Sequence, residues 1–185
     1  MDQTMLILLA VVAVAVIAGV LLLQRRRSQH LKSRFGPEYD HELEEKGSRS
    51  KAEAELAKRE KRVSKLDIVP LEPAARQQFV ERWTDVQAKF VDDPARAVAY
   101  ADALLAEVMS ARGYPVGDFD QRAGDISVDH PKVVEHYRAG HEVAVRHERG
   151  EAGTEDLRQA MIHYRSLFDE LVGENERSPQ PEAAH

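Results

Sequence analysis

A run of nineteen residues without a polar side chain, Met5 to Leu23, most constrains how this chain can fold. A helix of that length is about 28 Å long at 1.5 Å per residue, close to the ~30 Å hydrocarbon core of a bilayer. Thirteen of these residues are Leu, Ile or Val, which favours membrane insertion by about 4 to 8 kcal/mol. A buried helix of a small domain normally keeps a polar face. The run therefore predicts a transmembrane helix over residues 5–23, after a short N-terminus of residues 1–4.

The charges that flank the run indicate an uncleaved anchor and set its orientation. A secretory signal has positive charge before its apolar run and a small-residue cleavage site after it. Here no Lys or Arg precedes the run, and Gln24-Arg25-Arg26-Arg27 follows it. The positive-inside rule then predicts an external N-terminus and a cytoplasmic C-terminal domain. The basic collar expected to face anionic lipid consists of Arg25, Arg26, Arg27, Lys32 and Arg34.

Composition divides the rest of the chain into a basic part and an acidic part. Residues 24–65 hold 13 Lys and Arg against 8 Asp and Glu, whereas residues 66–185 hold 13 against 23. The acidic part argues against nucleic acid as a partner, because phosphate recognition needs a basic surface. The chain has no Cys, which excludes a disulfide framework and a thiolate nucleophile or metal site.

Residues 24–66 predict a charged helical stalk behind the basic collar. Acid-first pairs such as Glu42–Lys46 and Glu55–Arg59 support a helix, and Gly47-Ser48 is expected to soften it. Large apolar residues are too sparse for a sustained heptad seam, so a coiled coil is an open alternative. A small-xxx-small pair in the anchor, Ala15 and Gly19, leaves a homo-oligomer open as well.

Residues 67–174 predict an all-α domain, namely a four-helix bundle of two helical hairpins. Phe79, Trp83, Val86 and Phe90 recur at helical spacing, and Asp93-Pro94 is typical of an N-cap followed by Pro at the first helical position. A second pair of helices is expected to open at Asp129-His130-Pro131 and at Thr154, around a turn at Gly150 to Gly153. The polar tail, residues 175–185, is predicted to be disordered.

The sequence contains no catalytic motif, which predicts that the protein is not an enzyme. No phosphate loop, nucleophile elbow or kinase signature is present. His136 and His141 do not share a helical face as an HExxH pair does, so no metal and no cofactor is expected. His141, on an apolar face, is interpreted as a core histidine. An enzyme or a metal or cofactor binder that uses His130, His136 or His141 is the alternative.

The segment from Gly113 to Asp129 links the two predicted hairpins and is unusually long for a helix–helix connection. It mixes aromatic, basic and acidic side chains, as recognition surfaces do. A structural explanation is that its apolar residues plug one end of the bundle, with a short helix near residues 118–123. If the segment binds a protein partner, the candidate residues are Tyr114, Asp118, Phe119, Arg122 and His130.

Several stretches spread along the chain carry a resemblance to known proteins: RFGPEYD, KAEAELAKREKRV, FVDDP, RGYPVGDFDQRA, DISVDHP and TEDLRQAMIHYRSLF. With them the chain resembles a family of uncharacterised bacterial single-pass membrane-anchored helical proteins that has no assigned activity. The resemblance implies a bacterial inner-membrane location and no particular site residue. Together with the missing catalytic motifs, it favours a membrane-tethered binding or scaffold protein with membrane lipid and an unidentified protein as partners.

Overall fold

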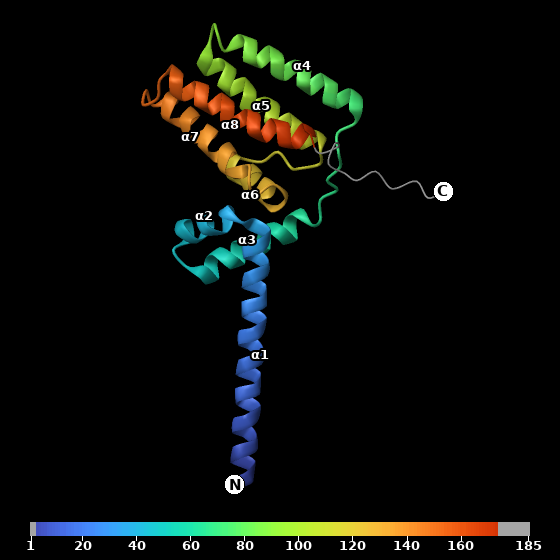
Figure 1. Ribbon diagram of the computed structural model, residues 1–185, viewed down its shortest axis with the longest axis vertical. Coiled ribbons are helices and arrows are strands. Elements are labelled where there is room, and N and C mark those ends of the chain that lie inside the picture. The colour runs from blue at the N-terminus through green and yellow to red at the C-terminus, as the bar shows by residue number, and fades with distance from the viewer. Residues whose placement is uncertain (1–2, 174–185) are drawn as a thin grey trace, which may run out of the picture. The chain divides into compact units, whose positions relative to one another are not determined.

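The computed structural model describes the backbone of residues 3–173 and the side chains from Val12 onward (Figure 1). Within this range the chain forms helices and no strand, which confirms the all-α prediction. The predicted disordered tail lies outside the described residues, as do residues 1 and 2. The helices are α1 (Gln3–Phe35), α2 (Pro37–Lys46), α3 (Arg49–Val63), α4 (Pro73–Lys89), α5 (Pro94–Ala111), α6 (Phe119–Asp129), α7 (Val134–Glu148) and α8 (Thr154–Gly173).

The chain divides into two compact units, residues 1–57 and residues 58–185. The division falls inside α3, upstream of the boundary expected at Asp67. The first unit holds α1, α2 and the first part of α3. The second unit holds the end of α3 and the five helices from α4 to α8.

In the first unit the chain folds back on itself after α1. Gly36 and Gly47 have φ angles of 49° and 62°, a left-handed conformation that glycine adopts without steric cost, and they connect α1, α2 and α3. The helices predicted over residues 24–66 are therefore present, but they do not form a solvated stalk. Apolar residues from three short stretches are buried rather than aligned in one seam: Leu31, Phe35, Tyr39, Ala52 and Leu56.

The large apolar side chains at the described end of the predicted anchor are exposed on α1. Their exposed fractions run from 47% for Val20 to 68% for Leu23. Across the residues that the structure describes, no helix is both long enough and apolar enough to cross a membrane. The described residues thus give no support to the predicted transmembrane helix over Met5–Leu23.

The second unit is a helical bundle built from the hairpins α4–α5 and α7–α8, as predicted. Helix α8 packs against α7, α5 and α4 (Figure 1). The predicted cap of α5 is confirmed, since the Asp93 carboxylate accepts a hydrogen bond from Arg96 N at 3.0 Å with Pro94 at the first helical position. In the core, the rings of Trp83 and Phe168 stack with centroids 4.6 Å apart. This core therefore joins α4 to α8.

The predicted start of the third bundle helix is wrong by several residues. Asp129 is the last residue of α6 and not a cap, and α7 begins only at Val134. The chain between these helices turns through His130, whose C=O accepts from Val133 N at 3.2 Å. The Asp-His-Pro pattern resembled an N-cap, but the preceding segment is itself helical, so the carboxylate of Asp129 is used elsewhere.

The connector before α4 packs closely on the end of α5. Val69 N donates to Arg112 O at 2.9 Å. Gly113 has a φ of 95°, and a Cβ at this position would lie 2.2 Å from Asp67 O. Glycine is required here for two reasons, the left-handed backbone and the close approach of a second chain segment.

A buried ion pair joins the end of α3 to α6 within the second unit. Arg62 donates to Asp125 Oδ1 from Nε at 2.6 Å and from Nη2 at 2.5 Å. The Asp125 side chain is fully buried, whereas 34% of the Arg62 side chain is exposed. Burial raises the pKa of the Asp125 carboxyl above its usual value, and attraction to Arg62 opposes that rise.

Candidate functional site

The predicted recognition segment is a structured part of the bundle. Its second half forms α6, and the Asp118 carboxylate caps this helix by accepting from Gln121 N at 2.8 Å. On the inner face of α6, Ala123 and Ile126 are fully buried in the core. Helix α6 is longer than the short helix predicted near residues 118–123. Its buried residues pack into the bundle, as the structural explanation of this segment predicted.

Two of the five candidate partner-binding residues lie in the interior. Tyr114 is 2% exposed, and its hydroxyl donates to Asp129 Oδ2 at 2.9 Å. His130 is 4% exposed, with its Nδ1 3.5 Å from a Glu170 carboxylate oxygen on α8. Buried side chains are not available to a partner in this conformation, so any recognition by this segment depends on its remaining, more exposed residues.

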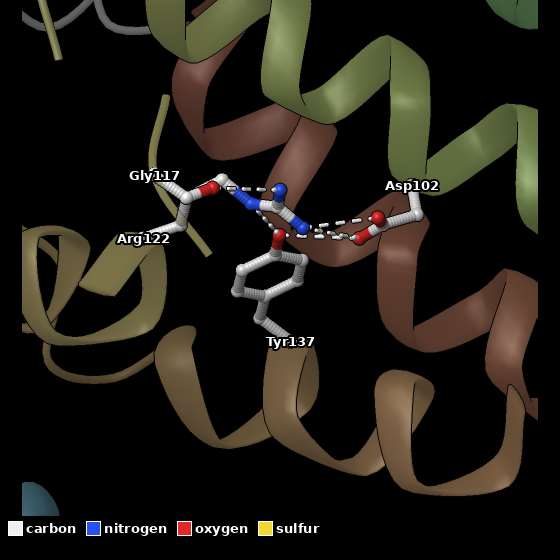
Figure 2. A network of polar contacts seen from close by, with 4 residues as sticks. All are labelled: Asp102, Gly117, Arg122 and Tyr137. Carbon is white, nitrogen blue, oxygen red and sulfur yellow. Dashed lines mark hydrogen bonds and ion pairs between the residues drawn. The ribbon is translucent and has the colours of Figure 1, made fainter. Parts of the chain in front are cut away.

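Arg122, the third candidate, is the centre of a polar network that joins three helices (Figure 2). From α6, its Nε donates to the Tyr137 hydroxyl on α7 at 2.9 Å, and its Nη2 donates to Asp102 Oδ2 on α5 at 3.0 Å. The Tyr137 hydroxyl in turn donates to Asp102 Oδ1 at 3.1 Å. A longer bond of 3.4 Å runs from Arg122 Nη1 to Gly117 O. The network therefore fixes α6 between the two hairpins.

The environment keeps this network in one protonation state. Burial, followed by the negative charge of Asp102, raises the pKa of Tyr137 far above its usual range, so the phenol stays protonated. Burial acts to lower the pKa of Arg122, but attraction to Tyr137 and Asp102 outweighs it, and the net pKa is raised. A permanently charged guanidinium and a protonated phenol cannot take up or release a proton near neutral pH. The arrangement suits bracing better than acid–base catalysis.

Aromatic rings surround the network. Phe119, the fourth candidate, stacks on His141 with ring centroids 3.6 Å apart and an 8° angle between planes. Burial lowers the pKa of His141, which keeps this imidazole neutral near pH 7. The His141 ring thus packs on an apolar neighbour, but His141 is only partly buried. The Tyr164 ring is a further neighbour of Tyr137, with ring centroids 5.9 Å apart.

The Tyr164 hydroxyl differs from that of Tyr137 in lacking a partner. It is fully buried and has no hydrogen bond to any residue that the structure describes. Burial raises the pKa of Tyr164 well above its usual range. The ring lies against Gly140, where a Cβ would be 2.6 Å from Tyr164 Cε1. The ring is therefore positioned by packing and not by its hydroxyl group.

A groove on the second unit offers another candidate surface for a partner. It lies between α4 and α8 and encloses about 350 Å³. Phe90, Met161 and Ile162 supply its apolar surface, and Ile162 is 47% exposed. Arg165 at the rim donates to Gln87 Oε1 at 3.2 Å and pairs with Asp169 at 2.7 Å. The mixture of apolar floor and charged rim is that of a protein-recognition surface.

Two histidines face each other across the α7–α8 hairpin. The Nδ1 atoms of His136 and His163 are 3.1 Å apart, and the ring planes are within 25° of parallel. Burial, together with the charge of His136, lowers the pKa of His163. In the part of the chain described, no group of three or more His, Cys, Asp or Glu side chains could hold a metal ion.

The basic collar of the first unit is exposed on α1, at Arg25, Arg26, Arg27, Lys32 and Arg34. Next to it, three helices meet at Glu53 of α3, which accepts from the Tyr39 hydroxyl at 2.8 Å and from Arg49 Nε at 2.8 Å. Ser28 on α1 donates to the same carboxylate oxygen at 2.5 Å. The collar therefore emerges from a small folded unit and not from a free stalk.

Sequence reasoning missed the partners that come from other helices. Asp102 and Tyr137 lie far from Arg122 in sequence, and nothing in their local patterns marks them as its partners. The His136–His163 pair carried a usable signal, because the two histidines lie on the two helices that flank the predicted turn at residues 150–153. Comparing histidines across that hairpin, and not only along one helix, would have identified the pair.

Comparison with known proteins adds no family or activity. No family model matches the chain, and neither a curated protein nor a solved structure matches it. The class that the structure defines is an all-helical protein with a helical bundle. The resemblance to a membrane-anchored bacterial family stays a prediction.

Proposed function

We propose that this protein is a membrane-tethered helical binding or scaffold protein, with its bundle on the cytoplasmic face and no enzymatic activity. One observation carries the tether. Helix α1 is continuous from Gln3 to Phe35, and its large apolar side chains between Val12 and Leu23 are exposed rather than packed. Such a surface is unfavourable in water and is the normal surface of a helix in lipid. The sequence continues the same run back to Met5, which gives a bilayer-spanning length.

The charges next to the apolar run support a cytoplasmic bundle. Arg25, Arg26 and Arg27 follow the run after Gln24 and make no ion pair with any described residue. Free basic residues at one end of an apolar helix are retained on the cytoplasmic side. They are also attracted to anionic lipid, by about 1 kcal/mol for each Lys or Arg near the surface.

For the bundle, a protein partner is supported by the groove between α4 and α8. Apolar side chains in a groove with a charged rim are the features that bury well against a partner. In the Asp102–Arg122–Tyr137 network the Asp102 carboxylate is already bonded to Arg122 and Tyr137, which supports a structural role over catalysis. Of the predicted recognition residues, Asp118 is exposed and Phe119 is partly exposed, so they form a second surface to test.

Topology is the first experiment. A reporter active only in the cytoplasm and a reporter active only outside it are each fused to the C-terminus of the full chain. A cytoplasmic signal together with retention in carbonate-washed membranes supports the tether and its orientation. A chain recovered in the soluble fraction would contradict the tether, and an external signal would reverse the orientation.

The partner is then sought by photo-crosslinking from single positions in cells. A photoreactive residue replaces Ile162 in the groove or Phe119 at the start of α6. Val91, which is 85% exposed at the α4–α5 turn, serves as the matched control. We expect one discrete crosslinked product from Ile162 and none from Val91. Equal products from all three positions, or none from any, would contradict a specific surface. A product of twice the chain mass would identify a second copy of this chain.

The His136–His163 pair supports a second candidate function, the binding of a divalent transition metal. Metal–nitrogen bonds of about 2.0 to 2.1 Å place two imidazole ligands of one ion about 3.0 to 3.4 Å apart, and the observed 3.1 Å falls in that range. Ligation needs neutral imidazoles, and the lowered pKa of His163 favours that form. Water would complete the coordination sphere, as suits Cu²⁺, Ni²⁺ or Zn²⁺.

Metal titration of the full chain in detergent separates this candidate from a simple histidine contact. We expect one Cu²⁺ or Zn²⁺ per chain, lost in either His136→Ala or His163→Ala. His41→Ala is the control, because His41 lies in the first unit beside Glu45 and outside the pair. Unchanged stoichiometry in the two bundle variants would exclude the site.

A further inference from the structure

A cleft in the first unit lies where the start of α3 passes α1. It encloses about 860 Å³, within the size range of small-molecule sites. Its two ends differ in chemistry. Ala18, Leu21 and Leu22 of α1 line the apolar end, whereas Arg25 and Arg27, further along the same helix, line the polar end with Arg49 of α3.

The polar end of the cleft has an excess of positive charge. Arg25 and Arg27 make no hydrogen bond or ion pair with any described residue. One acidic residue, Glu53, also lines the cleft, and its carboxylate is already engaged by Ser28, Tyr39 and Arg49. Burial acts to raise the pKa of Glu53, but these hydrogen bonds outweigh it and lower the pKa, so Glu53 stays ionised and holds Arg49 in place. Two guanidinium groups are therefore left for an external anion.

The backbone adds to this positive end. Helix α3 begins at Arg49 and has no acidic residue in its first turn, so no side-chain carboxylate there neutralises the partial positive charge of its N-terminus. Ser50, in that first turn, lines the cleft and offers a hydroxyl group. Guanidinium groups, helix N-terminal N–H groups and a hydroxyl are together the donors that bind phosphate oxygens.

From this arrangement we propose that the cleft binds the phosphate of an anionic phospholipid, whose acyl chain lies along the apolar end. The inference rests on the membrane tether proposed above, because the apolar end is continuous with the run Met5–Leu23. That run reaches the headgroup region near Gln24, at the level where a lipid phosphate meets Arg25. An inorganic phosphate would satisfy the donors but would leave Ala18, Leu21 and Leu22 uncovered. The cleft thus fits a ligand that is anionic at one end and apolar at the other.

Lipid retention by the full chain in neutral detergent tests the proposal. Native mass spectrometry counts bound phosphatidylglycerol and phosphatidylcholine during titration of each lipid. The test variant is Arg25→Gln with Arg27→Gln, which leaves the Glu53 network intact. The matched control is Arg26→Gln with Lys51→Gln, which removes the same charge from α1 and α3 at exposed residues outside the cleft lining.

We expect the wild-type chain to bind one phosphatidylglycerol in preference to phosphatidylcholine. The test variant should weaken that binding by about 30-fold if each guanidinium contributes about 1 kcal/mol, and the control by less than about threefold. Neutral detergent has no charged surface, so diffuse attraction is small. An equal loss of phosphatidylglycerol binding in both double variants, or no loss in either, would refute the proposal that the cleft is the binding site.

Two further measurements separate the possible failures. If millimolar inorganic phosphate displaces phosphatidylglycerol in a competition titration, free phosphate is the ligand and the lipid assignment is wrong. Carbonate-washed membranes containing wild type and both double variants report the tether independently. If the chain stays in the membrane but binds lipids without selectivity, the lipid site in the cleft is refuted and the membrane tether is not. If the wild-type chain is soluble, both the membrane tether and the lipid site are refuted.

Discussion

Two neighbouring tyrosines give a direct test of the polar network, because the same substitution should have opposite effects on them. Tyr137 and Tyr164 are both fully buried, and their ring centroids are 5.9 Å apart. The Tyr137 hydroxyl accepts from Arg122 and donates to Asp102. The Tyr164 hydroxyl has no hydrogen-bond partner among the described residues. Replacement by Phe removes a single oxygen atom in each case and preserves the ring.

The expected change in the free energy of unfolding follows from the hydrogen bonds that each tyrosine hydroxyl makes. Tyr137→Phe removes two hydrogen bonds to charged groups, each of which contributes about 1.5 to 3 kcal/mol. Asp102 keeps Arg122 and, with 28% of its side chain exposed, gains water, so we expect a net loss of about 2 to 3 kcal/mol. Tyr164→Phe removes a buried polar atom that is already unsatisfied. We expect it to leave stability unchanged or to raise it by up to about 1 kcal/mol.

Urea unfolding of the full chain in detergent measures both effects. Trp83 is the only tryptophan, and it is 1% exposed in the core, so its fluorescence reports unfolding of the second unit. At a slope of about 2 kcal/mol per molar urea, Tyr137→Phe should lower the midpoint by about 1 M. Equal losses in the two variants would show that ring packing, and not the network, determines the effect. A neutral Tyr137→Phe would refute the bracing role of Arg122.

Three further predictions follow from burial and backbone geometry. Arg62→Ala should lower the free energy of unfolding by about 2 to 3 kcal/mol, because the Asp125 carboxylate stays buried without Arg62. Asp125→Asn should lower it by about 1 kcal/mol, since the exposed part of Arg62 can reach water. Urea midpoints in the reverse order would contradict this prediction. Gly113→Ala should lower the free energy of unfolding by at least about 3 kcal/mol, and Gly150→Ala by about 1 kcal/mol. Both glycines have a positive φ, but only at Gly113 would a Cβ collide with a neighbouring carbonyl. Similar urea midpoints would show that this contact is unimportant. The folded state should also lose stability at alkaline pH, since burial raises the pKa values of Tyr137 and Tyr164 above the 10.0 of a free tyrosine. The stability linked to these two phenols is complete below pH 10.0 and is lost as the pH rises toward their folded-state pKa values. Urea midpoints measured from about pH 8 to 11 test this, and a flat profile above about pH 10 would refute it.

Local signals predicted the bundle well because its helices are marked by residues close in sequence. The Asp93-Pro94 cap and the helical spacing of Trp83 and Val86 depend only on the neighbouring turn, and the structure has both. The stalk was mispredicted for the opposite reason. Its apolar residues are too sparse for any one seam, yet residues from α1, α2 and α3 come together once Gly36 and Gly47 reverse the chain.

The candidate site depended still more on contacts between distant segments. The mixture of residues in the linking segment drew attention to Arg122 as a residue for binding a partner, but the sequence does not show whether such a side chain faces solvent or Asp102. The same holds for His130, which looks like a surface residue before a proline and is buried beside α8. Composition identified the segment, whereas only the packing of α5, α6 and α7 assigns its residues to the interior.

This packing changes how a partner surface can be tested. Deletion of residues 114–129 would remove Ala123 and Ile126 from the core, and it would take Arg122 from Asp102 and Asp125 from Arg62. Loss of binding in such a deletion would therefore report unfolding and not recognition. Exposed positions avoid this problem, because Ile162 in the α4–α8 groove can change without removing a buried hydrogen bond. A charged residue at Ile162 that abolishes crosslinking from a photoreactive residue at Ser166, which also lines the groove, while leaving the urea midpoint unchanged would assign binding to the groove and bracing to α6.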